Sequence, residues 1–191
     1  IAPELALIET AVDQALDHLH EVKLPATATA TRHRPPKVPA EAPDFVQRVT
    51  AARVEVGGEV VGSIGPGLLI LAAFEEVDAN ADLAWMSAKL ARLRIFPDAA
   101  GVMNRNVIDA KGELLAVSQF TLFASTRKGN RPSWSRAARP ELAQALFQNF
   151  VEQLESATGL RVQSGVFGAD MRVHLINDGP VTISIDSRRP E

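Results

Sequence analysis

Polar side chains follow an apolar segment in the middle of the chain. In the stretch ELLAVSQFTLF, residues 113–123, the apolar run gives way to Ser118, Gln119 and Thr121. Segments at strand ends often carry functional groups, because a rigid scaffold positions them there. A hydroxyl at such a place could attack an ester, or it could only satisfy nearby backbone groups. These residues alone leave both interpretations open.

Histidine is a common base for a serine nucleophile, but most histidines of this sequence are poorly placed for that role. Three of the 4 His residues, His18, His20 and His33, lie in an N-terminal segment that is a poor platform for a catalytic base. The fourth, His174, lies within an alternating segment typical of a strand. A Ser-His-Asp triad could therefore form only through His174, and the sequence disfavours it.

Composition and spacing exclude several other reaction centres. The chain has no Cys, which excludes disulfides, thiolate metal sites and a Cys nucleophile. No group of His and carboxylates has metal-ligand spacing, and the stretch GSIGPG lacks the Lys of a phosphate-binding loop. We therefore expect no cofactor and no metal. A hydrolase with so little base machinery would suit a reactive substrate, to which the protein offers backbone N–H groups for a developing oxyanion.

A Gly-Pro pair interrupts two alternating segments near the C-terminus. The stretch NDGPVT, residues 177–182, lies between MRVHLI and VTISID, which both alternate as half-buried strands do. The pair could be only a turn between two strands. It could also be a backbone element that contacts a substrate.

The charge of the chain is slightly acidic, with a formal net value of −3. A protein that binds nucleic acid through a bulk positive field would be basic, so any RNA contact must be local. One candidate is the segment 127–139, RKGNRPSWSRAAR, which carries five cationic residues and no acid. A solvated loop is the other interpretation.

From Phe45 onward the sequence predicts several β-strands and two main helices. A hairpin is predicted from FVQRVTAARVEV, a Gly57-Gly58 turn and EVVGSIG, followed by buried strands at GLLILAAF and ELLAVSQF. Asp78 is expected to cap the first helix, and Pro140 and Gly159 to begin and end the second. Because strands and helices do not alternate regularly, we predict an α+β fold with largely antiparallel β-sheet.

Residues 1–44 differ from the rest, and we predict that they form an extension to a domain at 45–191. Apolar residues recur at helical spacing from Pro3 to Lys23, which predicts an acidic amphipathic helix, and a Pro-, Ala- and Thr-rich linker follows. The acids argue against a transit peptide, and no apolar run approaches the roughly 20 residues that cross a bilayer. We expect a cytoplasmic protein without a membrane partner. Because the chain begins with Ile1, we also expect a processed product or an excerpt.

Five short motifs, in this order, resemble those of the D-aminoacyl-tRNA deacylase family. They are QRVT at 47–50, RIF at 94–96, SQFTL at 118–122, RPS at 131–133 and NDGPVT at 177–182. The resemblance runs from about Phe45 to about Asp186. It implies the fold of that family and a homodimeric, metal-independent esterase. Such an enzyme removes D-amino acids, and sometimes glycine mischarged on tRNA-Ala, from the 3′ end of tRNA, so the expected partner is aminoacyl-tRNA and not DNA.

The resemblance also implies roles for single residues. The Gly179-Pro180 peptide would be cis, and its carbonyl oxygens would hold the substrate's α-amino group in the active site of the partner subunit. Because Gly179 has no side chain, its backbone can approach a ligand closely, and a rigid carbonyl pair would reject an L-side chain. Arg48 would brace this loop. The expected catalytic residues are Ser118, Gln119, Phe120 and Thr121, and the expected substrate-binding residues are Arg48, Asn177, Gly179, Pro180, Phe167 and Met171.

The sequence leaves the mechanism with alternatives. Thr121 matches a residue sometimes treated as a nucleophile, but it lacks a base. We therefore favour attack by water assisted by the 2′-hydroxyl of the terminal adenosine, with a main-chain N–H near Phe120 as oxyanion donor. Phe167 and Met171 could line an adenosine pocket or only the core. Two other functions stay possible on this fold: a catalytically idle RNA-binding module, and a hydrolase of another activated ester.

Overall fold

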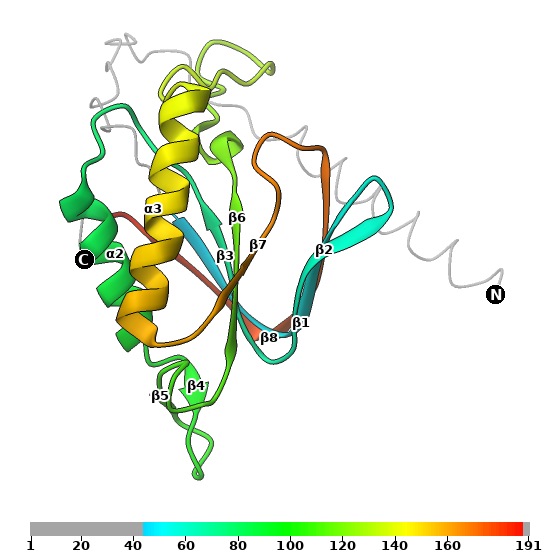
Figure 1. Ribbon diagram of the computed structural model, residues 1–191, viewed down its shortest axis with the longest axis vertical. Coiled ribbons are helices and arrows are strands. Elements are labelled where there is room, and N and C mark those ends of the chain that lie inside the picture. Colours follow the sequence, from blue (N-terminus) through cyan, green and yellow to red (C-terminus); the bar gives the residue numbers. More distant parts are fainter. Residues whose placement is uncertain (1–43, 189–191) are drawn as a thin grey trace, which may run out of the picture. The chain divides into compact units, whose positions relative to one another are not determined.

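The computed structural model describes residues 44–188, in which two helices lie against a six-stranded sheet (Figure 1). The helix predicted within residues 3–23 and the linker after it lie outside the described residues. Among the described residues, no helix has the length and apolar character to span a membrane.

Strand β1 (Asp44–Val56) is the centre of the sheet. Along one edge it pairs antiparallel with β8 (Met171–Ile185) over almost its whole length. Along the other edge it pairs antiparallel with β3 (Gly67–Ala72) in its first half and with β2 (Glu59–Ile64) in its second half. The predicted hairpin between β1 and β2 is confirmed, and its Gly57 and Gly58 both have positive φ, 61° and 90°.

Two further strands extend the sheet in parallel orientation. β6 (Glu113–Ser118) pairs with β3, and β7 (Val162–Ser164) pairs with β6, in the order β2-β1-β3-β6-β7. The predicted α+β fold with two main helices is confirmed, and the sheet has a parallel part around β6. Strands that are buried on both faces read as continuous apolar runs, which explains GLLILA and ELLAV.

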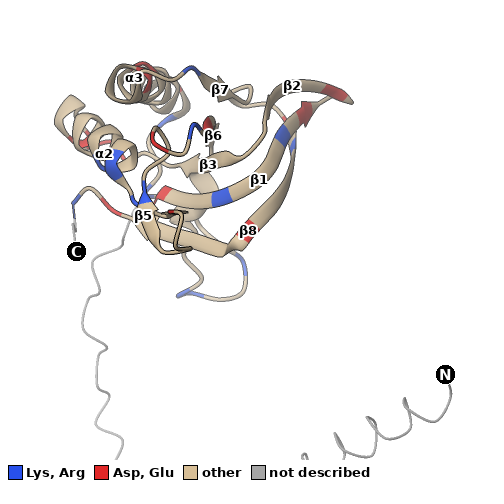
Figure 2. Ribbon diagram, turned by 90° about the horizontal axis from the view of Figure 1, so that it is seen from below, with Lys and Arg blue, Asp and Glu red and all other residues tan. Residues whose placement is uncertain are grey.

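The two faces of β3 and β6 contribute to separate cores. Helices α2 (Asn80–Arg92) and α3 (Pro140–Thr158) cover one face (Figures 1 and 2). Phe74 packs edge-on against two rings of α3, with centroids 6.5 Å from Phe147 and 6.2 Å from Phe150. The helix side takes Leu68, Ile70, Leu114 and Ala116 from the two strands, and the other side takes Leu69, Leu115 and Val117.

The ends of the helices confirm two predictions and correct one. Pro140 is the first residue of α3, and Gly159 ends it in the left-handed conformation with φ 69°. Asp78, however, does not cap α2. Its Oδ2 accepts a hydrogen bond from Glu75 N at 2.8 Å, while the residue before the helix is Ala79. The Asp82 carboxylate takes the capping role instead by accepting from Ala79 N at 2.9 Å.

The NDGPVT stretch is a bulge within one strand and not a turn between two strands. Val49 of β1 pairs with Asn177 and Gln47 pairs with Thr182. Two steps along β1 therefore correspond to five along β8, and three residues are extra. Both flanking segments continue to pair with β1, so the chain does not reverse direction at Gly179-Pro180.

The remaining elements are short. β4 (Phe96–Pro97) and β5 (Met103–Arg105) form a two-stranded ribbon, and a 3₁₀ helix, η1 (Phe120–Phe123), follows β6. The turn before β5 is held by Asp98, whose carboxylate accepts hydrogen bonds from Ala100 N, Val102 N and the Asn104 side chain. These bonds lower the pKa of Asp98, with the Asn104 bond the largest cause.

Candidate active site

A cavity of about 580 Å³ opens at the carboxyl end of β6. Its walls come from that strand end, from the residues after β3, from the start of α3 and the segment before it, and from the segment between β7 and β8. The volume is within the range of small-ligand sites. Five of the residues proposed from the sequence line it together: Ser118, Gln119, Phe120, Phe167 and Met171.

The parallel pairing of β3 and β6 explains why the polar residues lie at this cavity. The last paired residues of the two strands are Ala72 and Ser118, and Gln119 N donates to Ala72 O at 2.8 Å. Beyond Gln119 the chain leaves the sheet and enters η1. The N–H groups in the first turn of a helix have no partner within it, which leaves the Phe120 N–H available as a donor.

An aromatic pair stands at the edge of this cavity. The rings of Phe120 and Trp134 meet edge to face, with centroids 5.7 Å apart and an interplanar angle of 74°. Phe120 is 55% exposed and Trp134 37%, so ring surface stays open to solvent. Exposed aromatic faces beside a cavity suit stacking on a nucleobase. The sequence interpretation missed Trp134, and its only signal was its position directly after RPS.

Thr121 and His174 do not act together as a nucleophile and its general base. Thr121 does not line the cavity, and its Oγ1 accepts a short hydrogen bond from Gln119 Nε2. His174 Nε2 lies 3.2 Å from Glu55 Oε2, beside a different hollow on β1 and β8. Arg53 and His174 together lower the pKa of Glu55, with the Arg53 hydrogen bond the largest cause. The disfavoured triad is therefore not assembled among residues 44–188.

The Gly179-Pro180 peptide is cis, and the groups around it fix the bulge. Asn177 bridges its base, because Nδ2 donates to Val181 O and Oδ1 accepts from Val181 N, both at 3.0 Å. Arg48 is buried, and its Nη1 donates to Ile95 O at 2.5 Å. Gly179 and Pro180 are exposed.

Arg48 also forms an ion pair with this bulge. Its Nε lies 2.9 Å from Asp178 Oδ2, although the N–H is not directed at the oxygen as a hydrogen bond requires. The contact is therefore an ion pair, because charge attraction depends on distance more than on angle. Arg48 thus connects the bulge to the segment before β4.

Apart from Thr121, the residues proposed from the sequence fall into two groups. Asn177, Gly179 and Pro180 belong to the bulge and Arg48 of β1 contacts it, and none of these four lines the cavity. The cavity group and the bulge group are not brought together within the described part of one chain.

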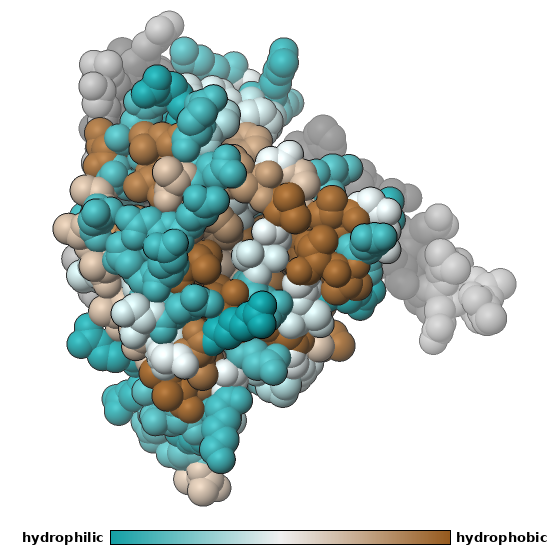
Figure 3. All heavy atoms as spheres, viewed as in Figure 1, coloured by the Kyte–Doolittle hydropathy of each residue, from teal (hydrophilic) through white to brown (hydrophobic). Residues whose placement is uncertain are grey.

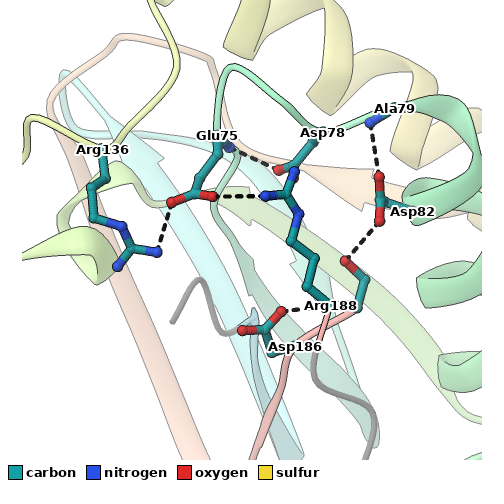
Figure 4. A network of polar contacts seen from close by, with 8 residues as sticks. Glu75, Asp78, Ala79, Asp82, Arg136, Asp186 and Arg188 are labelled. Carbon is teal, nitrogen blue, oxygen red and sulfur yellow. Dashed lines mark hydrogen bonds and ion pairs between the residues drawn. The ribbon is translucent and has the colours of Figure 1, made fainter. Parts of the chain in front are cut away.

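A charged network fixes the wall of the cavity at the start of α3 (Figure 4). Glu75 lies between two arginines, with Oε1 2.6 Å from Arg136 and Oε2 3.3 Å from Arg188. Arg188 also reaches Asp78 at 3.1 Å. Ala138 N donates to Phe74 O at 2.8 Å. The segment that carries Ala137 and Ala138 into the cavity wall is therefore anchored from several sides.

Asp44 is a buried acid behind this wall. Its Oδ1 accepts from Ala73 N at 3.1 Å, and Ala73 lines the cavity. Burial raises the pKa of Asp44 to about 8, with Asp78 and Asp186 adding to the effect. Within residues 44–188, no three acidic or histidine side chains lie where they could hold a metal ion.

The comparison with known sequences agrees with the motifs. A family model described as D-Tyr-tRNA(Tyr) deacylase matches residues 45–186. The D-aminoacyl-tRNA deacylase of Dechloromonas aromatica (strain RCB) is 65% identical over 146 residues, which are 76% of this chain and 97% of that protein. The D-aminoacyl-tRNA deacylase of Chromobacterium violaceum is 60% identical over 147 residues, 77% of this chain and 98% of that protein.

Solved structures show the same fold. A structure titled c-Myc DNA Unwinding Element Binding Protein superposes with a TM-score of 0.71 at 41% identity, over 75% of this chain and 97% of that one. A probable eukaryotic D-amino acid tRNA deacylase superposes with a TM-score of 0.65 at 18% identity, over 75% and 98%, and supports the fold alone. The resemblance stated from the motifs is confirmed, and so is the expected enzyme class, an ester hydrolase acting on aminoacyl-tRNA. This chain belongs to the D-aminoacyl-tRNA deacylase family.

Proposed function

We propose that this chain hydrolyses the ester bond between a D-amino acid and the 3′ end of tRNA, and that the cavity of one subunit is completed by the Gly179-Pro180 bulge of a second. The observation that carries the proposal is the separation of the two groups. The bulge is braced by Arg48 and Asn177 but faces solvent, and the cavity lacks any donor or acceptor from it. A second copy would unite them.

The proposed chirality filter depends on main-chain atoms. Carbonyl oxygens of the bulge would bind the α-amino group, and their rigid position would collide with an L-side chain. Because this selection does not read the side chain, many D-amino acids would be accepted. Glycine has no side chain to collide, so glycine mischarged on tRNA-Ala would also be a substrate.

The proposed chemistry uses the substrate's own 2′-hydroxyl to assist an attacking water. The described residues around Ser118 and Gln119 include no histidine or carboxylate on the cavity wall. The Phe120 N–H would stabilise the oxyanion. Phe167, Met171 and the Phe120–Trp134 pair would hold the terminal adenosine, since nucleobases stack on aromatic side chains. We expect neither a metal nor a cofactor in this reaction.

Exposed apolar residues support a homodimer. Figure 3 shows apolar side chains gathered at the surface over β2, where Val60 is 54% exposed and Val61 39%. On β8, Leu175 and Ile176 are also exposed. Exposed apolar surface of this kind is typical of protein–protein contact sites. We further propose that residues 1–44 are an extension to the deacylase domain at 45–191, that the protein acts in the cytoplasm, and that it does not bind DNA.

The experiment that tests the function compares matched D- and L-tyrosyl-tRNA with EDTA present throughout. We expect rapid release of tRNA from the D-ester and no release from the L-ester. Cleavage of both esters at one rate would remove the chirality filter, and loss of activity in EDTA would remove metal independence. If a folded dimer cleaved neither, the protein would be an RNA-binding module without activity.

A further inference from the structure

We propose that residues 126–132, here called the basic loop, bind the phosphates of the RNA strand that enters the cavity. The inference rests on the proposed function, because the scissile ester lies at the 3′ end of such a strand. It adds a binding surface outside the cavity, and the ligand is the phosphodiester backbone rather than the amino acid or the adenosine.

The base of the basic loop is held beside the cavity. Ser125 N donates to Ser133 O at 2.9 Å and Ser133 N donates to Ser125 O at 3.0 Å, so two backbone hydrogen bonds close the loop. Trp134 follows directly and lines the cavity. In Figure 1 the loop projects beyond the same end of the fold as the carboxyl end of β6 and the start of α3. A strand that leaves the cavity past Trp134 would next meet the basic loop.

The charges of the loop differ from those of the segment that follows it. Arg136 is paired with Glu75 at 2.6 Å, and Arg139 with Glu76 at 2.8 Å. Arg127, Lys128 and Arg131 are exposed, and within residues 44–188 none of them forms an ion pair. The segment 125–139 contains no acid, although the whole chain has a net charge of −3.

Three uncompensated cations on an anchored loop suit a local RNA contact. Such contacts release counterions from the nucleic acid, so they make affinity depend on salt. A loop that is only solvated would leave RNA affinity and its salt dependence unchanged when its charges are removed. This difference separates the two interpretations of the segment.

The test removes the three charges together in the full chain. The loop variant carries Arg127→Gln, Lys128→Gln and Arg131→Gln. A matched control carries Arg94→Gln, Lys111→Gln and Arg161→Gln, which remove the same charge near β4 and the starts of β6 and β7. Binding of tRNA that carries no amino acid is measured by fluorescence anisotropy between 50 and 200 mM KCl. Hydrolysis of D-tyrosyl-adenosine, which has no phosphate, is measured alongside.

We expect the loop variant to lose most of the salt dependence. Three contacts to a single strand correspond to a slope of about 2 in log affinity against log salt, so wild-type affinity should fall roughly 20-fold further than that of the variant over this range. Hydrolysis of D-tyrosyl-adenosine should not change. The control triple, and the charge-preserving pair Arg127→Lys and Arg131→Lys, should behave as wild type.

Two results would overturn the proposal. One is a wild-type salt slope in the loop variant. The other is parallel loss of D-tyrosyl-adenosine hydrolysis in the loop variant but not in the control, since the loop would then shape the cavity instead of binding phosphate. If wild type cleaves neither ester, the proposed function fails, but tRNA binding by the loop and control variants still decides the role of the loop.

Discussion

The cavity at the end of β6 is formed mainly by side chains, whereas the Gly179-Pro180 bulge on β8 exposes main chain. Side chains from four separate segments form the cavity, and most of them are apolar. The bulge presents main chain to solvent, and the side chains near it serve to hold that main chain in place. Cavity residues would therefore set how tightly the nucleoside binds, whereas bulge residues would set how accurately chirality is read.

Among the substitutions, Gly179→Ala is expected to have the largest effect on activity. Gly179 has φ 126°, and a Cβ there would lie 2.7 Å from Val181 Cγ2 and 3.0 Å from Arg48 Nη2. The bulge must shift, and a displacement near 1 Å can cost about 100-fold in rate. We expect kcat/KM for D-tyrosyl-tRNA to fall roughly 100-fold while D-tyrosyl-adenosine still binds the cavity.

Gly57→Ala provides the matched control for this substitution. Gly57 also has a positive φ, 61°, but a Cβ there would meet nothing within 4 Å. This variant should lose about 1 kcal/mol of stability without loss of activity. If Gly179→Ala kept wild-type kcat/KM and selectivity, the bulge would have no part in the reaction.

The second prediction concerns the brace. Arg48→Met keeps the length of the side chain but removes the hydrogen bond to Ile95 O and the ion pair with Asp178. Because the bulge then has one fewer anchor, we expect kcat/KM for the D-ester to fall on the order of tenfold and the ratio of D to L hydrolysis to narrow. Steady-state kinetics with both esters measure this.

Arg53→Met on the same strand is its control. Arg53 pairs with Glu55 at 2.8 Å, but its side chain is 48% exposed, and exposed ion pairs contribute little. Its kinetics should match wild type. An equal loss of kcat/KM in both variants would show that activity depends on the charge of β1 in general, and that Arg48 has no specific effect on the bulge.

Much of the fold could be predicted because it depends on local patterns. The apolar runs of β3 and β6, the glycine hairpin and the two ends of α3 all have short-range signals. The prediction that Asp78 caps α2 is wrong, because two acids, Asp78 and Asp82, lie close to the start of that helix and either could accept its backbone hydrogen bond. Only the turn at 75–78 decides between them, and it is fixed by tertiary contacts.

The arrangement of the site was less accessible to sequence reasoning. In the sequence, the Gly-Pro stretch is compatible with a turn. That it is a bulge depends on the pairing of both its flanks with β1, which lies more than a hundred residues away in the sequence. Trp134 has no sequence signal beyond its position directly after RPS, so its ring contact with Phe120 emerges only from the fold. The division into a cavity group and a bulge group has no local signal at all.

The third prediction concerns Asp44, the buried acid behind the cavity wall, and the pH dependence of stability. Its pKa is about 8 in the folded protein and near 4 when unfolded, so the folded state binds more protons between these values. Stability therefore decreases as pH rises through this window, by at most about 1.4 kcal/mol per pH unit. Asp44→Asn should flatten the profile between pH 5 and 8, measured by urea unfolding.

Asp98→Asn is the control for that measurement. The pKa of Asp98 is lowered, so the stability it adds is lost only as pH falls below the usual range of an Asp. It should leave the slope between pH 5 and 8 unchanged. A steep slope that survives in Asp44→Asn would assign the titration to another group.

The smallest effect is expected from Thr121→Val, which tests whether the cavity holds a nucleophile. The Thr121 hydroxyl accepts from Gln119 Nε2 and lies off the cavity wall, so its loss should change kcat by less than about threefold. A D-tyrosyl-tRNA whose terminal 2′-hydroxyl is replaced by hydrogen should react at least about 100-fold more slowly, as expected for a lost proton-transfer group. If Thr121→Val abolished turnover while Thr121→Ser kept it, the hydroxyl would be the nucleophile. The cavity would then contribute reacting atoms as well as binding, and its contrast with the bulge would become one between chemistry and selection.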